Sequence, residues 1–222
     1  MKLLLTDAGV RNPTIERALL DLLGRPVSEC TALCIPTAGY GAPDADPFLP
    51  WDFISGRAPG PMTGLGWKAV GVLELTALPS LDDALWHSWV CDADVLLANG
   101  GDPLYLVHWL RASGLADLFP TLAHTVYVGL SAGSLAMTPR VGEHFVGWRP
   151  AGGGDEALGV VDFSMFVHLD LPGSPLHTME QAERWAAGIG GPAYATDRQT
   201  AIRVVDGVAD VVSEGRWRRW PQ

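Results

Sequence analysis

The chain has 222 residues, 48% of them hydrophobic, and a formal net charge of −10. This length supports one sizeable core, and we expect a single domain over residues 1–222. The negative charge would repel a nucleic-acid backbone or an anionic membrane surface, and no apolar run approaches the roughly 20 residues of a membrane-spanning helix. We therefore expect neither nucleic acid nor membrane as a partner.

Short apolar runs alternate with helical patterns, which is typical of a mostly parallel sheet with helices on both faces. The first helix has clear boundary signals, because Asn12 can cap it, Pro13 suits its first position and Gly24 can stop it. The expected strands cover residues 2–6, 31–39, 68–75, 93–101, 125–130 and 163–170, and the expected helices cover residues 12–24, 81–91, 103–114 and 178–188.

Between the second and third strands lies one long irregular excursion, residues 40–66, rich in Gly, Pro and Asp. A loop of this length in a compact domain is functional or locally structured. We expect it to form the edge of a site or a subunit contact, the latter making a homodimer possible. The C-terminal part, from residue 192 onward, predicts antiparallel strands, with a hairpin turn at Asp206-Gly207 and a last strand over "RWRRW".

The three cysteines, Cys30, Cys34 and Cys91, are odd in number and lack metal-ligand spacing with any histidine. This usage predicts unpaired thiols in a reducing cytoplasm. No metal and no organic cofactor is implied.

The most informative motif is Gly129-Leu130-Ser131-Ala132-Gly133, which ends the strand at 125–130 and leads into a helix start. A Gly-x-Ser-x-Gly segment in this setting predicts a nucleophile elbow, a strained turn that presents the serine hydroxyl above the sheet edge. The N–H of Ala132 would then be one oxyanion donor. The alternative is a glycine-rich turn with a capping serine.

A second oxyanion donor is expected from another strand end, and Gly100-Gly101 is the natural candidate. The alternative is an ordinary tight turn before a helix that starts at Pro103. As base for Ser131 we favour His168, because it ends a strand expected to run beside the serine strand. His144 is the second choice. The other histidines lie in helix patterns, at a helix end or in a Pro-rich loop: His87, His108, His124 and His177.

The carboxylate that would orient the base is the least determined part of the site. Five acidic residues lie within reach in the sequence, and spacing does not choose among them: Glu143, Asp155, Glu156, Asp162 and Asp170.

The segments "GLSAGS", "NGGDPLYLVHWLRASGL", "LLLTDAGVRNPTIERALLDLLG" and "HLD" together resemble the peptidase E family of serine peptidases, and the likeness extends from Lys2 to Trp217. The resemblance implies a three-layer α/β sandwich of the class I glutamine amidotransferase-like, flavodoxin-like type. It also implies a Ser131 nucleophile, a His168 base and an acid near Glu143, the nearest carboxylate. The oxyanion hole would comprise Gly100, Gly101 and Ala132.

Three positions depart from the family pattern. His144 stands where relatives often carry an acid, Val167 precedes His168 in place of proline, and Asp102 follows the glycine pair in place of asparagine. Two neighbouring classes are excluded: glutamine amidotransferases need a cysteine at the elbow, and α/β-hydrolases place their histidine near the C-terminus, whereas no histidine follows His177.

The resemblance predicts a serine hydrolase that cleaves short peptides with an N-terminal aspartate through a Ser131 acyl-enzyme. An arginine such as Arg149 or Arg198 is a candidate to bind the substrate carboxylate. Two alternatives remain, namely a hydrolase or acyltransferase of the same fold that acts on another amide or ester, and a non-catalytic ligand-binding relative.

Overall fold

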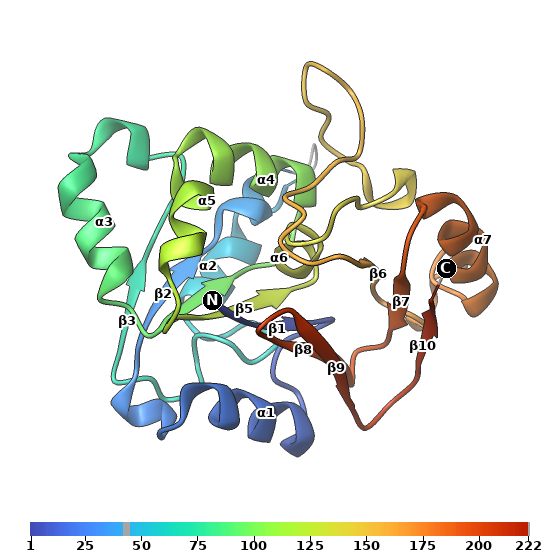
Figure 1. Cartoon of the computed structure of the whole chain (residues 1–222), viewed down its shortest axis with the longest axis horizontal. Coiled ribbons are helices and arrows are strands. Elements are labelled where there is room, and N and C mark those ends of the chain that lie inside the picture. The colour runs from blue at the N-terminus through green and yellow to red at the C-terminus, as the bar shows by residue number, and fades with distance from the viewer. Residues whose placement is uncertain (42–44, 222) are drawn as a thin grey trace.

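The central sheet has seven strands: β1 (Lys2–Thr6), β2 (Thr31–Ile35), β3 (Ala69–Val72), β4 (Val95–Ala98), β5 (Val126–Leu130), β8 (Thr200–Val205) and β9 (Val208–Ser213). The computed structural model describes residues 1–41 and 45–221. From edge to edge the order is β3-β2-β4-β5-β1-β8-β9, with β3 to β1 parallel and β8 and β9 antiparallel (Figure 1). This confirms the predicted mostly parallel sheet and C-terminal hairpin.

Helices cover both faces of this sheet, with α1 on one side and α3, α4 and α5 on the other (Figure 1). Strand β1 shows why: Leu3 and Leu5 enter one apolar core, while Leu4 enters the other. A strand buried on both faces is characteristic of a parallel sheet in a three-layer fold. The helices are α1 (Pro13–Leu23), α2 (Phe48–Ile54), α3 (Asp83–Cys91), α4 (Pro103–Ala112), α5 (Leu115–Leu118), α6 (Ala132–Leu135) and α7 (Met179–Ile189).

The predicted boundaries of α1 are confirmed. The Asn12 side chain accepts a hydrogen bond from the Ile15 N–H at 2.9 Å, Pro13 is the first helical residue, and Gly24 ends the helix with a left-handed φ of 69°. None of the helices in the described ranges has the length and apolar character needed to span a bilayer.

A second, smaller sheet contains β6 (Ser164–Phe166), β7 (Ala193–Thr196) and β10 (Trp217–Trp220), in the order β10-β7-β6. Strand β7 is parallel to β6 and antiparallel to β10. The prediction of a strand over 163–170 beside the serine strand is therefore wrong. That strand is shorter and pairs with β7 in the small sheet, where Phe166 packs with Trp185 of α7 while Met165 faces the main core.

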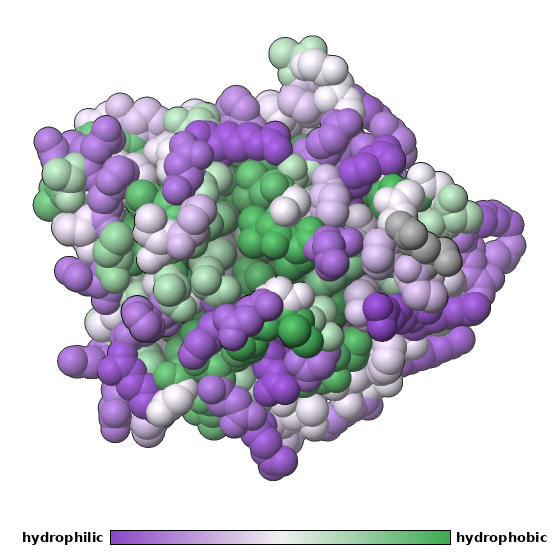
Figure 2. Space-filling view, viewed as in Figure 1, coloured by the Kyte–Doolittle hydropathy of each residue, from purple (hydrophilic) through white to green (hydrophobic). Residues whose placement is uncertain are grey.

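The excursion at 40–66 is locally structured, as expected, although its residues 42–44 lie outside the described part. It contains α2, whose Phe53 is buried in the core on the α1 side, while Phe48, Leu49 and Trp51 are exposed. The excursion is tied to the end of β1, because the Val10 N–H donates to the Pro61 carbonyl at 2.9 Å. Its expected role as a subunit contact remains a prediction. Figure 2 shows apolar atoms around the centre of one face of the molecule and hydrophilic atoms around its rim.

Candidate active site

The site begins at the carboxyl ends of β1 and β5, which are adjacent and parallel. Their register pairs Thr6 with Leu130, so the next residues along the two strands, Asp7 and Ser131, leave the sheet at the same edge. Side chains at such an edge converge, and this is where α/β sheets assemble their sites. Neighbouring strands therefore bring together two residues that are far apart in the sequence.

Ser131 has the geometry of a nucleophile elbow. It lies between β5 and α6 with φ 50° and ψ −110°, a conformation that a residue with a side chain rarely adopts. The Ser131 N–H donates to the Thr6 carbonyl at 3.1 Å, which holds the turn against β1. Strain of this kind persists only where the surrounding structure supports it.

The two glycines of the motif are required by close approach of the backbone. A Cβ on Gly129 would lie 2.6 Å from the Ser134 nitrogen, and one on Gly133 would lie 2.5 Å from the Ala98 oxygen. Both distances are shorter than real Cβ contacts, so a side chain at either position would push the elbow away from the strands.

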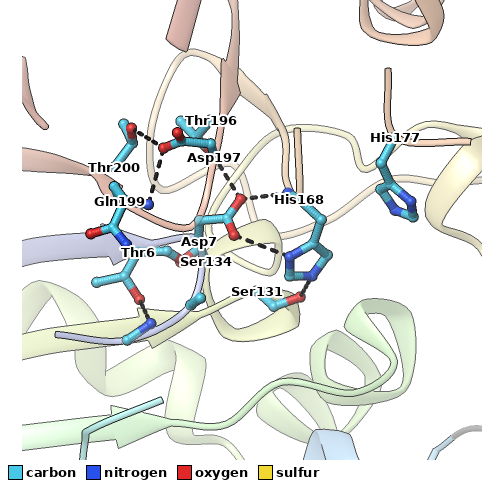
Figure 3. A network of polar contacts seen from close by, with 12 residues as sticks. Thr6, Asp7, Ser131, Ser134, His168, His177, Thr196, Asp197, Gln199 and Thr200 are labelled. Atoms are coloured by element: carbon cyan, nitrogen blue, oxygen red, sulfur yellow. Dashed lines mark hydrogen bonds and ion pairs between the residues drawn. The ribbon is translucent and has the colours of Figure 1, made fainter. Parts of the chain in front are cut away.

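His168 reaches Ser131 from the segment that follows β6. Its Nε2 lies 2.8 Å from the Ser131 Oγ, and the two side chains point toward each other in Figure 3. Its backbone has a left-handed φ of 65°, and its backbone N–H donates to the Asp7 carboxylate. The structure thus brings together the predicted serine and histidine, although they come from different sheets.

Asp7 is the carboxylate that contacts His168. Its Oδ1 lies 3.1 Å from His168 Nδ1, and its Oδ2 accepts from the His168 backbone N–H and from the Thr196 hydroxyl, at 3.3 Å for the latter (Figure 3). The residue is fully buried. A carboxylate at Nδ1 favours the tautomer with the proton on that nitrogen, which leaves Nε2 free to accept the proton of Ser131.

Glu143 does not contact His168. It lies in a short 3₁₀ helix (Glu143–Phe145), its side chain is 70% exposed, and it pairs with Arg149 at 2.6 Å. The Arg149 guanidinium lowers the pKa of the Glu143 carboxyl through a hydrogen bond and its charge. The prediction that Glu143 is the acid at His168 is therefore corrected, because the carboxylate in contact with His168 is that of Asp7.

Two of the other acidic candidates have partners elsewhere, and no contact of Glu156 or Asp162 with His168 occurs among the described residues. Asp155 binds Arg140 at 2.8 Å and the Gly142 N–H at 2.9 Å, and Asp170 pairs with Arg216 at 2.7 Å.

Asp7 was not among the predicted acids because it lies far from Ser131 and His168 in the sequence, whereas all five candidates lie between residues 143 and 170. A usable signal was present: "LLLTDAG" is a buried strand that ends in a carboxylate, and parallel strands end at one edge of a sheet. Once β1 is placed beside β5, Asp7 becomes the natural partner of the site.

Two of the predicted oxyanion donors, Gly100 and Ala132, lie next to the serine. A Cβ on Gly100 would lie 3.5 Å from the Ser131 Cβ, and Ala132 directly follows the serine at the start of α6. The Gly100 N–H already donates to Asn99 Oδ1 at 2.8 Å. Within the described ranges, the N–H of Gly101 has no such acceptor. The next residue, Asp102, caps α4 by accepting from the Tyr105 N–H at 2.9 Å, which anchors the glycine pair.

A cavity of about 530 Å³ opens beside these groups. Its walls come from the strand ends, from the excursion at 45–60 and from the segment after β7. The lining includes two arginines, Arg11 and Arg198, together with Asp7, Gly100, Gly101 and His168. No cluster of three histidine, cysteine or acidic side chains suited to a metal ion occurs among the described residues.

In serine hydrolases, a serine is hydrogen-bonded to a histidine, which is in turn hydrogen-bonded to an aspartate. The same arrangement occurs here on a three-layer α/β fold, with the aspartate buried. The sequence matches the family model described as Peptidase family S51 over residues 3–212, so the chain belongs to that family and is a serine-type peptidase. No curated protein matches the sequence.

Two solved structures have the same fold. One is a candidate peptidase E protein from Listeria monocytogenes EGD-e, with 17% identity and a TM-score of 0.69, covering 96% of this chain and 98% of that chain. The other is a peptidase from an acI-B1 Actinobacterium, with 18% identity and a TM-score of 0.69, covering 99% of this chain and 93% of that chain. Together with the family match, they confirm the predicted fold and the peptidase E resemblance.

Proposed function

We propose that this peptidase hydrolyses short peptides with an N-terminal aspartate through an acyl-enzyme on Ser131. The observation that carries the proposal is the continuous series of contacts from Ser131 Oγ to His168 Nε2, at 2.8 Å, and from His168 Nδ1 to Asp7 Oδ1, at 3.1 Å. The site draws on both sheets, so we take residues 1–222 as one catalytic unit.

In the first half of the reaction, Ser131 Oγ attacks the carbonyl carbon of the scissile peptide bond while His168 Nε2 takes its proton. Asp7 holds the His168 ring and stabilises the positive charge that forms on it. The C–N bond then breaks, His168 gives the proton to the leaving amine, and the acyl group remains on Ser131 as an ester.

In the second half, water attacks the ester carbonyl while His168 again accepts a proton. The bond to Ser131 Oγ breaks, His168 returns the proton to the serine, and the free acid leaves. The negative oxygen in both halves is stabilised by backbone N–H groups. We assign this role to Ala132 and Gly101, because the N–H of Gly100 is already bonded to Asn99.

Two arginines support an acidic substrate. Arg11 and Arg198 both line the cavity, and burial together with the charge of Arg198 lowers the pKa of Arg11. Neither guanidinium is in ion-pair contact with a carboxylate in the described part of the chain. Three aspartates, Asp7, Asp46 and Asp52, also line the cavity, and the charge of Asp7 opposes the lowering of the Arg11 pKa. Two neighbouring cations outside any ion pair nevertheless favour binding of an anionic group, and the β-carboxylate of an N-terminal aspartate meets that requirement.

The test is hydrolysis of Asp-Leu, Glu-Leu, Asn-Leu and Ala-Leu by the wild type and by Ser131→Ala. We expect cleavage of Asp-Leu that is lost in the variant, and labelling of the wild type alone by a fluorophosphonate. Labelling of Ser131 without cleavage of any dipeptide would instead favour another amide or ester substrate. Cleavage of Asp-Leu by Ser131→Ala at the wild-type rate would refute the assigned nucleophile.

A further inference from the structure

His177 lies beside the histidine of the site, although nothing in the proposed reaction uses it (Figure 3). The centroid of its ring is 5.8 Å from that of His168, and the two rings are close to perpendicular, at 67°. On its other sides it packs against His144 at 5.3 Å and Phe166 at 6.1 Å. The ring therefore fills the space between His168 and an aromatic cluster.

Two hydrogen bonds fix His177 to the segment that carries His168. Its Nδ1 is 2.7 Å from the Ser174 hydroxyl, and its carbonyl accepts from the Asp170 N–H at 2.6 Å. Both His168 and Asp170 have left-handed φ values, 65° and 56°. Such backbone geometry is costly for residues with side chains and persists where neighbouring groups hold it. His177 is one of those groups.

We propose that His177 is a positioning residue for His168. Its ring packs against the His168 imidazole and keeps it directed at Ser131. Because the His177 ring is neutral, only His168 carries a positive charge during the reaction. The inference rests on the proposed function, because it assumes that His168 accepts the proton of Ser131.

The charges around His177 give this role a pH dependence. Burial lowers the pKa of His177, positive charge on His168 or His144 lowers it further, and the Asp7 carboxylate opposes the shift. The ring is therefore neutral at neutral pH. In acid it gains a charge beside the position where His168 must become positive, and two like charges so close disfavour each other. Protonation of His177 in acid therefore opposes the charge that His168 gains in the reaction.

The test compares His177→Ala, His177→Phe and Ser174→Ala. A matched control is His87→Ala, which removes another half-buried ring that packs on an aromatic neighbour, Trp86, at 4.1 Å. Two rates are measured: labelling of Ser131 by a fluorophosphonate, and cleavage of Asp-Leu. We expect His177→Ala to lower kcat and the labelling rate by about tenfold or more with KM changed by less than about twofold, since the base is misplaced while the cavity is intact.

His177→Phe separates the steric effect of the ring at position 177 from the effect of its charge. It keeps a ring in place, so we expect near-wild-type kcat at neutral pH. The wild-type kcat/KM should fall with two protons at the acid end of a profile from about pH 4 to 7, whereas the variant should fall with one. A merely structural role would not change this slope.

Unchanged labelling, kcat and pH profile in His177→Ala would overturn the inference, and a two-proton fall in His177→Phe would overturn its electrostatic part. If His177→Ala does not fold, Ser174→Ala decides: loss of the Nδ1 contact should lower kcat about threefold, and no change would count against the proposal. A wild type that is neither labelled nor active contradicts the proposed function itself, whereas a labelled wild type with an unaffected His177→Ala contradicts only this inference.

Discussion

Ser131 and Asp7 directly follow two paired strands of the parallel sheet, whereas His168 lies in the segment after a strand of the separate small sheet. On the first side, the Thr6 carbonyl accepts from both the Ser131 N–H, at 3.1 Å, and the Ser134 hydroxyl, at 2.8 Å. On the second side, His168 is joined to the large sheet through Asp7. Ser131 and Asp7 therefore share the rigidity of the main sheet, whereas the position of His168 depends on a few specific contacts.

The largest effect is expected where the two sides meet, at Asp7. Asp7→Asn keeps the shape but reverses the hydrogen-bond preference at His168 Nδ1, so the ring loses the tautomer that accepts the proton of Ser131. We expect kcat for Asp-Leu to fall by about 10⁴-fold, the order found for this change in a Ser–His–Asp arrangement, with little change in KM.

Glu143→Gln is the control, because this exposed carboxylate binds Arg149 and not His168. Its kcat should equal that of the wild type. A large loss in Glu143→Gln together with an active Asp7→Asn would reverse the assignment of the acid.

Gly129→Ala tests the rigid side alone. The new methyl group would lie 2.6 Å from the Ser134 nitrogen, and its nearest neighbours are all backbone atoms of Gly133 and Ser134, which cannot rotate away as a side chain could. We expect a loss of about 1–3 kcal/mol in the free energy of unfolding from overpacking, together with a strong fall in labelling of Ser131. Urea unfolding and fluorophosphonate labelling measure the two effects.

Gly24→Ala is a suitable comparison for Gly129→Ala, since Gly24 has open space around it but a left-handed φ. It should cost stability without affecting labelling. Equal labelling losses in the two variants would mean that the elbow is not the sensitive element.

The cavity between the two sides should respond in KM rather than in kcat. Arg198→Ala removes one of the two cations that line it, so binding of an acidic substrate weakens while the reacting groups stay in place. We expect KM for Asp-Leu to rise about tenfold with kcat within about twofold. Arg219→Ala, at a strand of the small sheet, is the matched control. A fall in kcat without a change in KM would argue against substrate binding by Arg198.

The smallest effect concerns how His144, in the aromatic cluster near His168, makes stability depend on pH. Burial lowers the pKa of His144 in the folded protein, so the unfolded chain binds more protons as the pH falls through about 6.5. This contribution to stability is present above that pH and is lost as the pH falls toward the folded pKa. In His144→Phe, the fall in the urea midpoint between about pH 7.5 and 5.5 should be smaller than in the wild type. An equal or larger fall would contradict the prediction.

Local signals predicted much of this fold. The alternation of apolar runs and helical patterns indicated the parallel sheet, and Asn12, Pro13 and Gly24 marked the ends of α1 because capping depends on neighbours in the chain. The elbow was equally local, since its strand, its two glycines and Ser131 lie within one short stretch. The strand predicted at 163–170 is only the three residues Ser164–Phe166, and so short a segment does not specify which sheet it will join.

The sequence by itself determined the class of fold, the nucleophile elbow and the pairing of Ser131 with His168 as candidates. Only the tertiary structure brought Asp7 into contact with His168, paired Glu143 with Arg149 at the surface, and placed the His177 ring beside His168. The physical reason is the range of the interactions. Caps and tight turns are set by residues a few positions apart, whereas the contacts of Asp7 depend on the pairing of β1 with β5 and on the approach of a second sheet, which no local pattern specifies.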